Sequence, residues 1–248
     1  MNDTLDALAF YLVFVAAVTC HEAAHAWAAK IGGDLTAYRG GQVSLDPIPH
    51  MKREPIGMVV LPLITVSTLG WPLGYASTPY DPVWAGRYPR RAAWMALAGP
   101  AANFGLVLVA ALLIHTGIGF GLFEAPDSLS LTSIVAAADA GESSDVAGGF
   151  ALTRGSTLIR GFAQGLSLFY SMNVLLLVLN LIPLPPLDGS SALPLILPTQ
   201  WNLAYQRLLR QPMIGWLGII VVWNLLGQIF YPILFFSITL LYPGLSYS

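Results

Sequence analysis

Charged residues are scarce in this sequence. They account for 10% of its 248 residues, whereas an ordinary soluble domain contains roughly 25%. The net charge at pH 7 is −2 and no run of lysine or arginine occurs, so we expect no nucleic-acid partner. Because Cys20 is the single cysteine, the sequence also excludes an intramolecular disulfide and a cysteine-rich metal site.

Hydrophobic residues make up 56% of the chain and occur in long blocks instead of amphipathic stripes. Blocks of about 20 apolar residues are long enough to cross a bilayer. We predict membrane helices over residues 5–29, 92–115 and 165–187. A fourth block, 212–242, is longer than one crossing needs and contains Pro232, which predicts either one kinked helix or two short segments. The sequence therefore predicts an all-α polytopic membrane protein.

The amino terminus lacks the basic residues of a secretory signal and has Asp3 and Asp6 in their place, so we expect the first hydrophobic block to be a retained helix.

Another block, 56–74, contains two prolines and lies between basic segments. If both flanks are cytoplasmic, as basic flanks usually are, this block is a re-entrant segment; a simple crossing is the alternative. The re-entrant topology places the amino terminus and the acidic linker at 116–164 outside. The flanking basic residues are Arg39, Lys52, Arg53, Arg87, Arg90 and Arg91.

Two short segments carry local signals. Residues 35–46 alternate between apolar and polar side chains around a Gly40-Gly41 pair, which predicts a short β-hairpin. Residues 141–149 are rich in Gly, Ser and Asp, which predicts a mobile loop.

The first predicted helix contains His21-Glu22-Ala23-Ala24-His25, which fits the pattern H-E-x-x-H. On a helix the two imidazoles lie one turn apart and about 40° round, so both can reach one metal ion. Glu22 lies beside them and can take a proton from a metal-bound water. The alternative is a set of polar residues that are hydrogen-bonded inside a helix bundle. An Asp, Lys or Arg at the bilayer centre costs about 2.5 to 3.5 kcal/mol, which favours a functional role for this ionisable cluster.

Catalytic zinc needs a third protein ligand. The best candidate is Asp188, in the stretch "NLIPLPPLDGS" at the end of the third predicted helix. Three prolines stop that helix and hold Asp188 on extended backbone, on the same side of the membrane as the histidines. The alternative is a plain turn in which Asp188 faces water. Most of the remaining acidic residues lie in the predicted outer linker, the terminus or the hairpin region, so Asp188 is preferred.

Together these motifs resemble the site-2 protease family of intramembrane zinc metalloproteases. H-E-x-x-H occurs at 21–25, "AGPAAN" at 98–103 matches the family's G-P-x-x-N, and "NLIPLPPLDG" at 180–189 matches N-x-x-P-x-P-x-L-D-G in every specified position. A fourth stretch, 33–57, follows the pattern usual in compact bacterial and archaeal members.

The resemblance implies a single integral membrane protease domain over 1–248, with a three-helix catalytic core at about 5–190 and a C-terminal membrane segment at about 212–242. In that core His21, His25 and Asp188 hold one zinc ion. Glu22 activates water to cleave a peptide bond within a transmembrane helix of another protein. The implied location is a prokaryotic cytoplasmic membrane, with the site toward the cytoplasm.

Asn103 and Asn180 match family positions near the site, and the resemblance implies that they steady the substrate or the tetrahedral intermediate. Hydrogen bonding between helices is the alternative for both. The sequence departs from the family at Asp46, where asparagine is usual, and at 70–82, which keeps only Gly-Trp and scattered prolines. These departures concern substrate recognition. The chain has no room for the inserted peptide-binding domain of larger members.

Two other functions fit parts of the pattern. A different membrane-bound H-E-x-x-H peptidase would need a later glutamate as third ligand, but no Glu follows Glu142. A metal transporter or a non-enzymatic scaffold would also place His and Asp in a membrane. A transporter needs no general base, so Glu22→Gln separates it from a protease.

One strand of the predicted hairpin at 35–46 offers an edge with which the backbone of an unwound substrate can pair.

Overall fold

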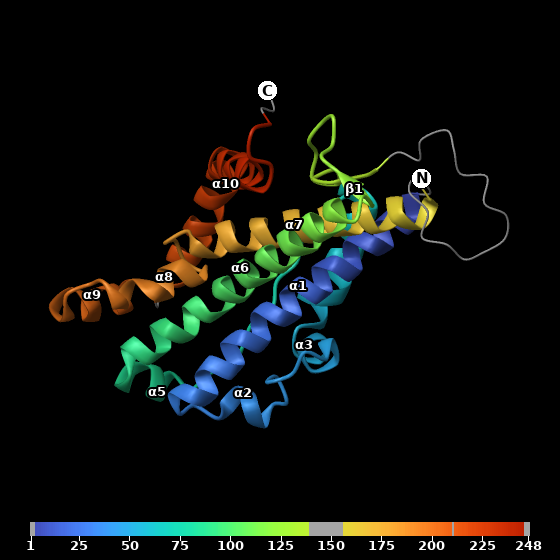
Figure 1. Ribbon diagram of the computed structural model, residues 1–248. Helices are drawn as coiled ribbons and strands as arrows, with labels where there is room; N and C mark the ends of the chain where they lie inside the picture. Colours follow the sequence, from blue (N-terminus) through green and yellow to red (C-terminus); the bar gives the residue numbers. More distant parts are fainter. Residues whose placement is uncertain (1–2, 139–155, 210, 246–248) are drawn as a thin grey trace.

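The computed structural model describes residues 3–138, 156–209 and 211–245 (Figure 1). Four helices in these ranges are long and apolar enough to cross a membrane. They are α1 (Asp3–Gly32), α6 (Pro89–Gly119), α7 (Thr157–Leu181) and α10 (Pro212–Leu241). The predicted fold class, an all-α polytopic membrane protein, is confirmed. The loop predicted at 141–149 lies outside the described residues.

Helices α1, α6 and α7 lie side by side and form the centre of the molecule (Figure 1). Helices α1 and α7 begin at the same end, where Gln164 Nε2 donates to Asp6 Oδ1 at 3.5 Å, and α6 runs the other way. Small residues that are fully buried, such as Ala26 and Ala29 of α1 and Ala93 of α6, line the helix contacts. Small side chains let helix backbones approach closely in lipid, where packing replaces the hydrophobic effect as the main attraction.

Helix α7 begins and ends earlier than predicted. Its first turn forms because the Ser156 hydroxyl accepts a hydrogen bond from the Ile159 N–H. It ends at Leu181, since Pro183 cannot donate a backbone hydrogen bond and disfavours helical backbone in the residue before it. The chain then turns into three short helices: α8 (Asp188–Ala192), the 3-10 helix η2 (Leu193–Leu195) and α9 (Thr199–Leu209).

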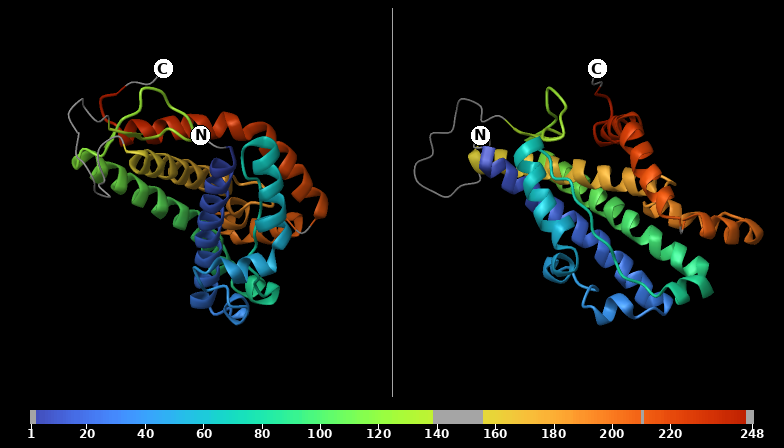
Figure 2. Two further views of the ribbon diagram at one scale, coloured as in Figure 1. Left: turned by 90° about the vertical axis from the view of Figure 1, so that its right-hand side faces the viewer. Right: turned by 180° about the vertical axis from the view of Figure 1, so that it is seen from behind.

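Five short elements connect α1 to α6. They are α2 (Thr36–Arg39), α3 (Pro47–Arg53), the π-helix η1 (Ile56–Val60), α4 (Leu61–Leu69) and α5 (Pro82–Arg87). Gly70, with φ 71°, ends α4, and the chain then returns in extended form (Figure 2, right). The Tyr75 N–H donates to the Gly57 carbonyl at 3.1 Å, so the returning chain reaches the level where η1 begins. The chain thus runs out and back, and the re-entrant topology of 56–74 stays a prediction.

The β-hairpin predicted at 35–46 is wrong. Residues Thr36–Arg39 form the helical turn α2. The Asp34 carboxylate accepts hydrogen bonds from the backbone N–H and the hydroxyl of Thr36, which favours a helical start over an extended strand. The two-stranded antiparallel sheet that the structure does contain lies between α6 and α7, and it pairs β1 (Phe123–Glu124) with β2 (Ala136–Ala137).

The C-terminal block forms one helix, α10, with Pro232 inside it. The helix changes direction along its length (Figure 2, left). Its C-terminal half joins the main core, where Phe230, Leu234 and Ile238 pack in one cluster with Tyr170 and Val174 of α7. Its N-terminal half, residues 213–226, lies against α9, and most of its side chains are exposed.

Candidate metal centre

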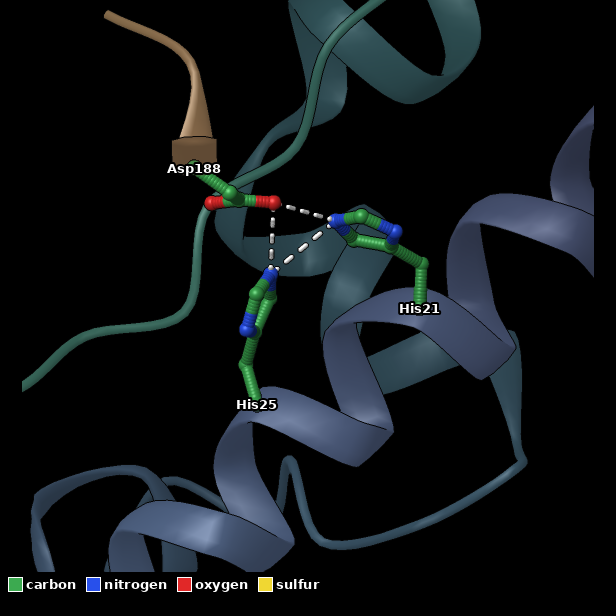
Figure 3. A group of neighbouring side chains, drawn as sticks. All are labelled: His21, His25 and Asp188. Carbon is green, nitrogen blue, oxygen red and sulfur yellow. Dashed lines mark hydrogen bonds and ion pairs between the residues drawn. The ribbon is translucent and has the colours of Figure 1, made fainter. Parts of the chain in front are cut away.

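Two histidines and one aspartate meet where α1 passes the start of α8 (Figure 3). The two Nε2 atoms of His21 and His25 are 2.9 Å apart. Asp188 Oδ2 lies 3.0 Å from His21 Nε2 and 3.2 Å from His25 Nε2. Within the described ranges, this is the sole group of three His, Cys, Asp or Glu side chains whose ligand atoms converge.

The environment of His25 sets its tautomer. Its Nδ1 lies 2.7 Å from the Met95 backbone carbonyl oxygen. A carbonyl oxygen only accepts, so Nδ1 carries the proton and donates it. The neutral ring therefore presents a lone pair at Nε2, toward His21 and Asp188.

The tautomer of His21 is set by a chain of side-chain hydrogen bonds. The chain ends at the Phe169 carbonyl, which accepts from Asn173 Nδ2 at 2.8 Å. Asn173 therefore turns its Oδ1 toward Asn103, whose Nδ2 donates at 2.9 Å. Asn103 then offers its own Oδ1 to His21 Nδ1 at 2.6 Å. Since every link depends on one acceptor-only carbonyl, His21 also keeps its proton on Nδ1 and its lone pair on Nε2.

Three lone-pair atoms that face one another repel unless a cation lies between them. Two imidazole nitrogens and a carboxylate oxygen are the donor set of catalytic zinc sites with one open position. Tetrahedral ligand atoms about 2.0 to 2.1 Å from zinc lie about 3.3 Å from one another, close to the 2.9 to 3.2 Å separations found here. The side chains present therefore fit a zinc ion.

Gly99 of α6 keeps the space in front of the imidazoles open. A Cβ atom at this position would overlap the Nε2 atoms of both His21 and His25. Gly99 is buried, and the next residue, Pro100, continues the same helix. Any side chain here would fill the volume into which the two lone pairs point.

Asp188 owes its place to the turn after α7. Gly189 follows it, and a Cβ on Gly189 would lie 2.5 Å from the carbonyl oxygens of Leu181 and Ile182. The glycine thus lets the turn pack on the end of α7.

Glu22 is buried beside this group and forms no hydrogen bond with it. Its Oε2 accepts from the Thr78 hydroxyl, with an oxygen separation of 2.7 Å. Thr78 belongs to the extended chain that returns from α4, so this chain passes directly alongside α1. The carboxylate is thereby held in one orientation next to the two histidines.

A cavity of about 690 Å³ opens in front of the site. Glu22, His25 and Asp188 all line it. Its walls are the extended chain at 76–80, the first part of α6, the turn at 185–191 and the start of α10. A molecule that enters this cavity therefore meets the carboxylate of Glu22 and the converging ligand atoms together.

The two asparagines predicted near the site occupy different places. Asn103 is fully buried and orients His21, and it does not line the cavity. Asn180 is half-buried, lies outside the cavity lining and bonds to none of the three converging side chains. The sequence analysis missed Asn173, Met95 and Thr78. A buried asparagine in an apolar helix was a usable signal for Asn173, whereas nothing local distinguishes Met95 or Thr78.

Comparisons with known proteins agree with this geometry. The family described as "Peptidase family M50" matches residues 9–208. A Bacillus subtilis (strain 168) protein named "Putative zinc metalloprotease YwhC" is 30% identical over 188 residues, which are 72% of this chain. The match spans 65% of that relative's own length. No solved structure matches the chain.

Proposed function

Because this chain belongs to peptidase family M50, the site-2 protease family of metalloproteases, we propose that it is a zinc-dependent endopeptidase that cleaves membrane-protein substrates within or near a transmembrane helix. One observation carries the proposal. The lone pairs of His21, His25 and Asp188 converge within 3.2 Å of one another beside a buried glutamate, at the wall of a cavity.

In this proposal His21, His25 and Asp188 hold the zinc ion. A zinc ion held there would supply Lewis-acid chemistry and would lower the pKa of water toward about 7. Glu22 takes the proton of the attacking water and passes it to the leaving amine. Thr78 keeps the Glu22 carboxylate aimed at the cavity, and Asn103 keeps the Nε2 of His21 aimed at the metal.

The substrate must be unwound before this site can act on it. A membrane helix keeps its peptide groups hydrogen-bonded to one another, so no peptide bond is free for attack. The strand edge that was expected on a hairpin at 35–46 does not exist. The extended chain at 76–80 lies along the cavity instead, next to Glu22, and supports the proposal that an unwound substrate segment binds there.

Charge supports an orientation in which the site faces the cytoplasm and the amino terminus lies outside. Lys30, Arg39, Arg87, Arg90 and Arg91 all lie where α1 ends and α6 begins. The opposite end, where α1 begins and α6 ends, carries acidic side chains such as those of Asp6 and Glu124. Basic residues favour the cytoplasmic side of a membrane. This orientation places the proposed metal site nearer the cytoplasmic face.

The test compares the wild-type protein with Glu22→Gln in bilayers that contain a model transmembrane substrate. The substitution keeps the size of the side chain but removes the base. We expect Glu22→Gln to retain zinc and to lose substrate cleavage by about 100-fold or more. Cleavage at the wild-type rate by Glu22→Gln would contradict the proposed role of the glutamate and with it the protease mechanism.

A further inference from the structure

The turn that carries Asp188 lies at the edge of the three-helix core. Helix α7 ends at Leu181, and the turn is closed by its own backbone hydrogen bonds, from Leu187 N to the Leu184 carbonyl and from Ser190 N to the Leu187 carbonyl. One side of it faces the cavity. A carboxylate that binds a metal needs a fixed position. Its distance from the metal can vary by only about 0.2 Å.

Helix α10 supports this turn from outside the core. Gly218 of α10 is buried against Pro185, which lies three residues before Asp188. A Cβ atom on Gly218 would overlap the carbonyl oxygen of Pro185. Since the obstructing atom is backbone, it cannot rotate away as the end of a flexible side chain can. The backbones of α10 and the turn are therefore in direct contact.

Gly218 lies in the N-terminal half of α10, where few side chains are packed against the rest of the protein. Of residues 213–222, only Gly218 and Val222 are buried. Large side chains around them, including Trp216 and Ile220, are more than half exposed. The contact between Gly218 and Pro185 is thus one of few packed contacts that this half of α10 makes.

Helix α9 supports the other side of the turn. The Tyr205 hydroxyl donates a hydrogen bond to the carbonyl oxygen of Ser190, two residues after Asp188, at 2.8 Å. Burial raises the pKa of the Tyr205 phenol, so the group stays protonated and remains a donor. The carbonyl that accepts this bond belongs to α8, the short helix that Asp188 begins.

The two contacts therefore flank the aspartate on both sides. We propose that Gly218 and Tyr205 are positioning residues, which fix the turn so that the Asp188 carboxylate stays at metal-binding distance from His21 and His25. Neither Gly218 nor Tyr205 lines the cavity. The inference rests on the proposed function, since it assumes that Asp188 is a zinc ligand. Gly218 lies beyond residues 9–208, which the family match covers, so the match itself does not imply this contact.

The first experiment compares Gly218→Ala with Gly227→Ala. Both changes add one methyl group to α10, but the methyl at Gly227 meets only ordinary contacts with Tyr231, at 3.9 Å or more. Zinc dissociation constants are measured by chelator competition on the purified full chain, and cobalt is substituted to record its visible absorption. We expect Gly218→Ala to bind zinc about tenfold more weakly and to alter the cobalt spectrum. Gly227→Ala should match the wild type in both measurements.

The second experiment removes the hydroxyl alone. Tyr205→Phe is compared with Tyr231→Phe, whose side chain is 50% exposed. We expect Tyr205→Phe to weaken zinc binding several-fold, and the control to leave it unchanged. This variant also keeps the proposal falsifiable if Gly218→Ala fails to fold. Wild-type zinc affinity and a wild-type cobalt spectrum in folded Gly218→Ala, or in Tyr205→Phe, would overturn the proposal.

A third measurement separates this inference from the proposed function. Hydrogen exchange at residues 183–191 is followed in metal-free protein, where zinc plays no part. Faster exchange there in Gly218→Ala and Tyr205→Phe than in their controls supports the positioning role, and unchanged exchange contradicts it. A wild-type protein that binds no zinc would instead contradict the proposed function, whatever the exchange data show.

Discussion

At the scale of single residues, the candidate site depends on proton placement. His21 and His25 have the same chemistry, but their Nδ1 atoms are held by different partners, a side-chain amide for His21 and a backbone carbonyl for His25. The motif spacing predicted that both imidazoles reach one metal, because that relation is local to one helix. The anchors Met95 and Asn173 come from other helices, and no spacing within the motif specifies them.

Asn103, the side chain that holds Nδ1 of His21, can be replaced. Asn103→Leu keeps the approximate volume, leaves Asn173 without its donor and no longer fixes the His21 ring. We expect zinc affinity to fall by about 10- to 100-fold, as is usual for partners of metal-bound histidines. Zinc titration checks this, with Asn224→Leu as the matched control, because Asn224 is exposed on α10 and bonds only within its own helix. Equal zinc affinity in the two variants would refute the orienting role.

Gly99 provides a steric test of the same site. In Gly99→Ala the new methyl group collides with both Nε2 atoms, so we expect the protein to lose stoichiometric zinc. Gly105→Ala changes the same helix where nothing lies within 4 Å, and it should retain the metal. Zinc content after purification distinguishes the two. A Gly99→Ala protein with full zinc content would place the metal elsewhere.

At the scale of elements, the length of the hydrophobic blocks predicted helices correctly. The short alternation of apolar and polar residues at 35–46 predicted a hairpin wrongly. Long apolar blocks predicted α1, α6, α7 and α10, because a membrane-spanning helix satisfies its own backbone and needs no partner to be recognised. The hairpin at 35–46 was wrong because a few alternating residues are a weak signal. The Asp34 carboxylate, which accepts hydrogen bonds from the backbone N–H and the hydroxyl of Thr36, outweighed them.

Asp34 also joins α2 to the segment before α5 and gives a pH-dependent prediction. It accepts hydrogen bonds from Thr36 in α2 and from the backbone N–H of Asp81, which precedes α5. Burial alone raises the pKa of Asp34, but the bonds from Thr36 and Asp81 lower it by more, so the folded pKa lies below the ordinary 3.8. The stability that this carboxylate contributes is therefore full above the ordinary pKa and is lost as the pH falls through the folded value.

We expect Asp34→Asn to lower the free energy of unfolding by about 1 to 3 kcal/mol near neutral pH, because the amide cannot accept all of these bonds. The difference from the wild type should shrink below about pH 4. Thermal unfolding in detergent at several pH values measures both effects. A difference that stays constant down to pH 3 would show that the charge of Asp34 is not involved.

At the scale of the whole molecule, the arrangement of helices brings together residues that are 163 positions apart in the chain. Helices α1 and α7 run in the same direction, so the turn after α7 arrives beside the second half of α1, at the histidines. The sequence predicted this meeting from membrane topology and basic flanks. It did not predict the support from α9 and α10, since Gly218 and Tyr205 belong to no pattern and acquire their role only through packing.

The most direct test of the central claim is the metal content of the purified protein. We expect about one zinc ion per chain in the wild type, and we expect Asp188→Ala to lose it although His21 and His25 are intact. Asp127→Ala, which removes an exposed aspartate between α6 and α7, should keep it. Loss of zinc in Asp188→Ala alone would establish that the aspartate completes the site. Undiminished zinc in Asp188→Ala would contradict the account.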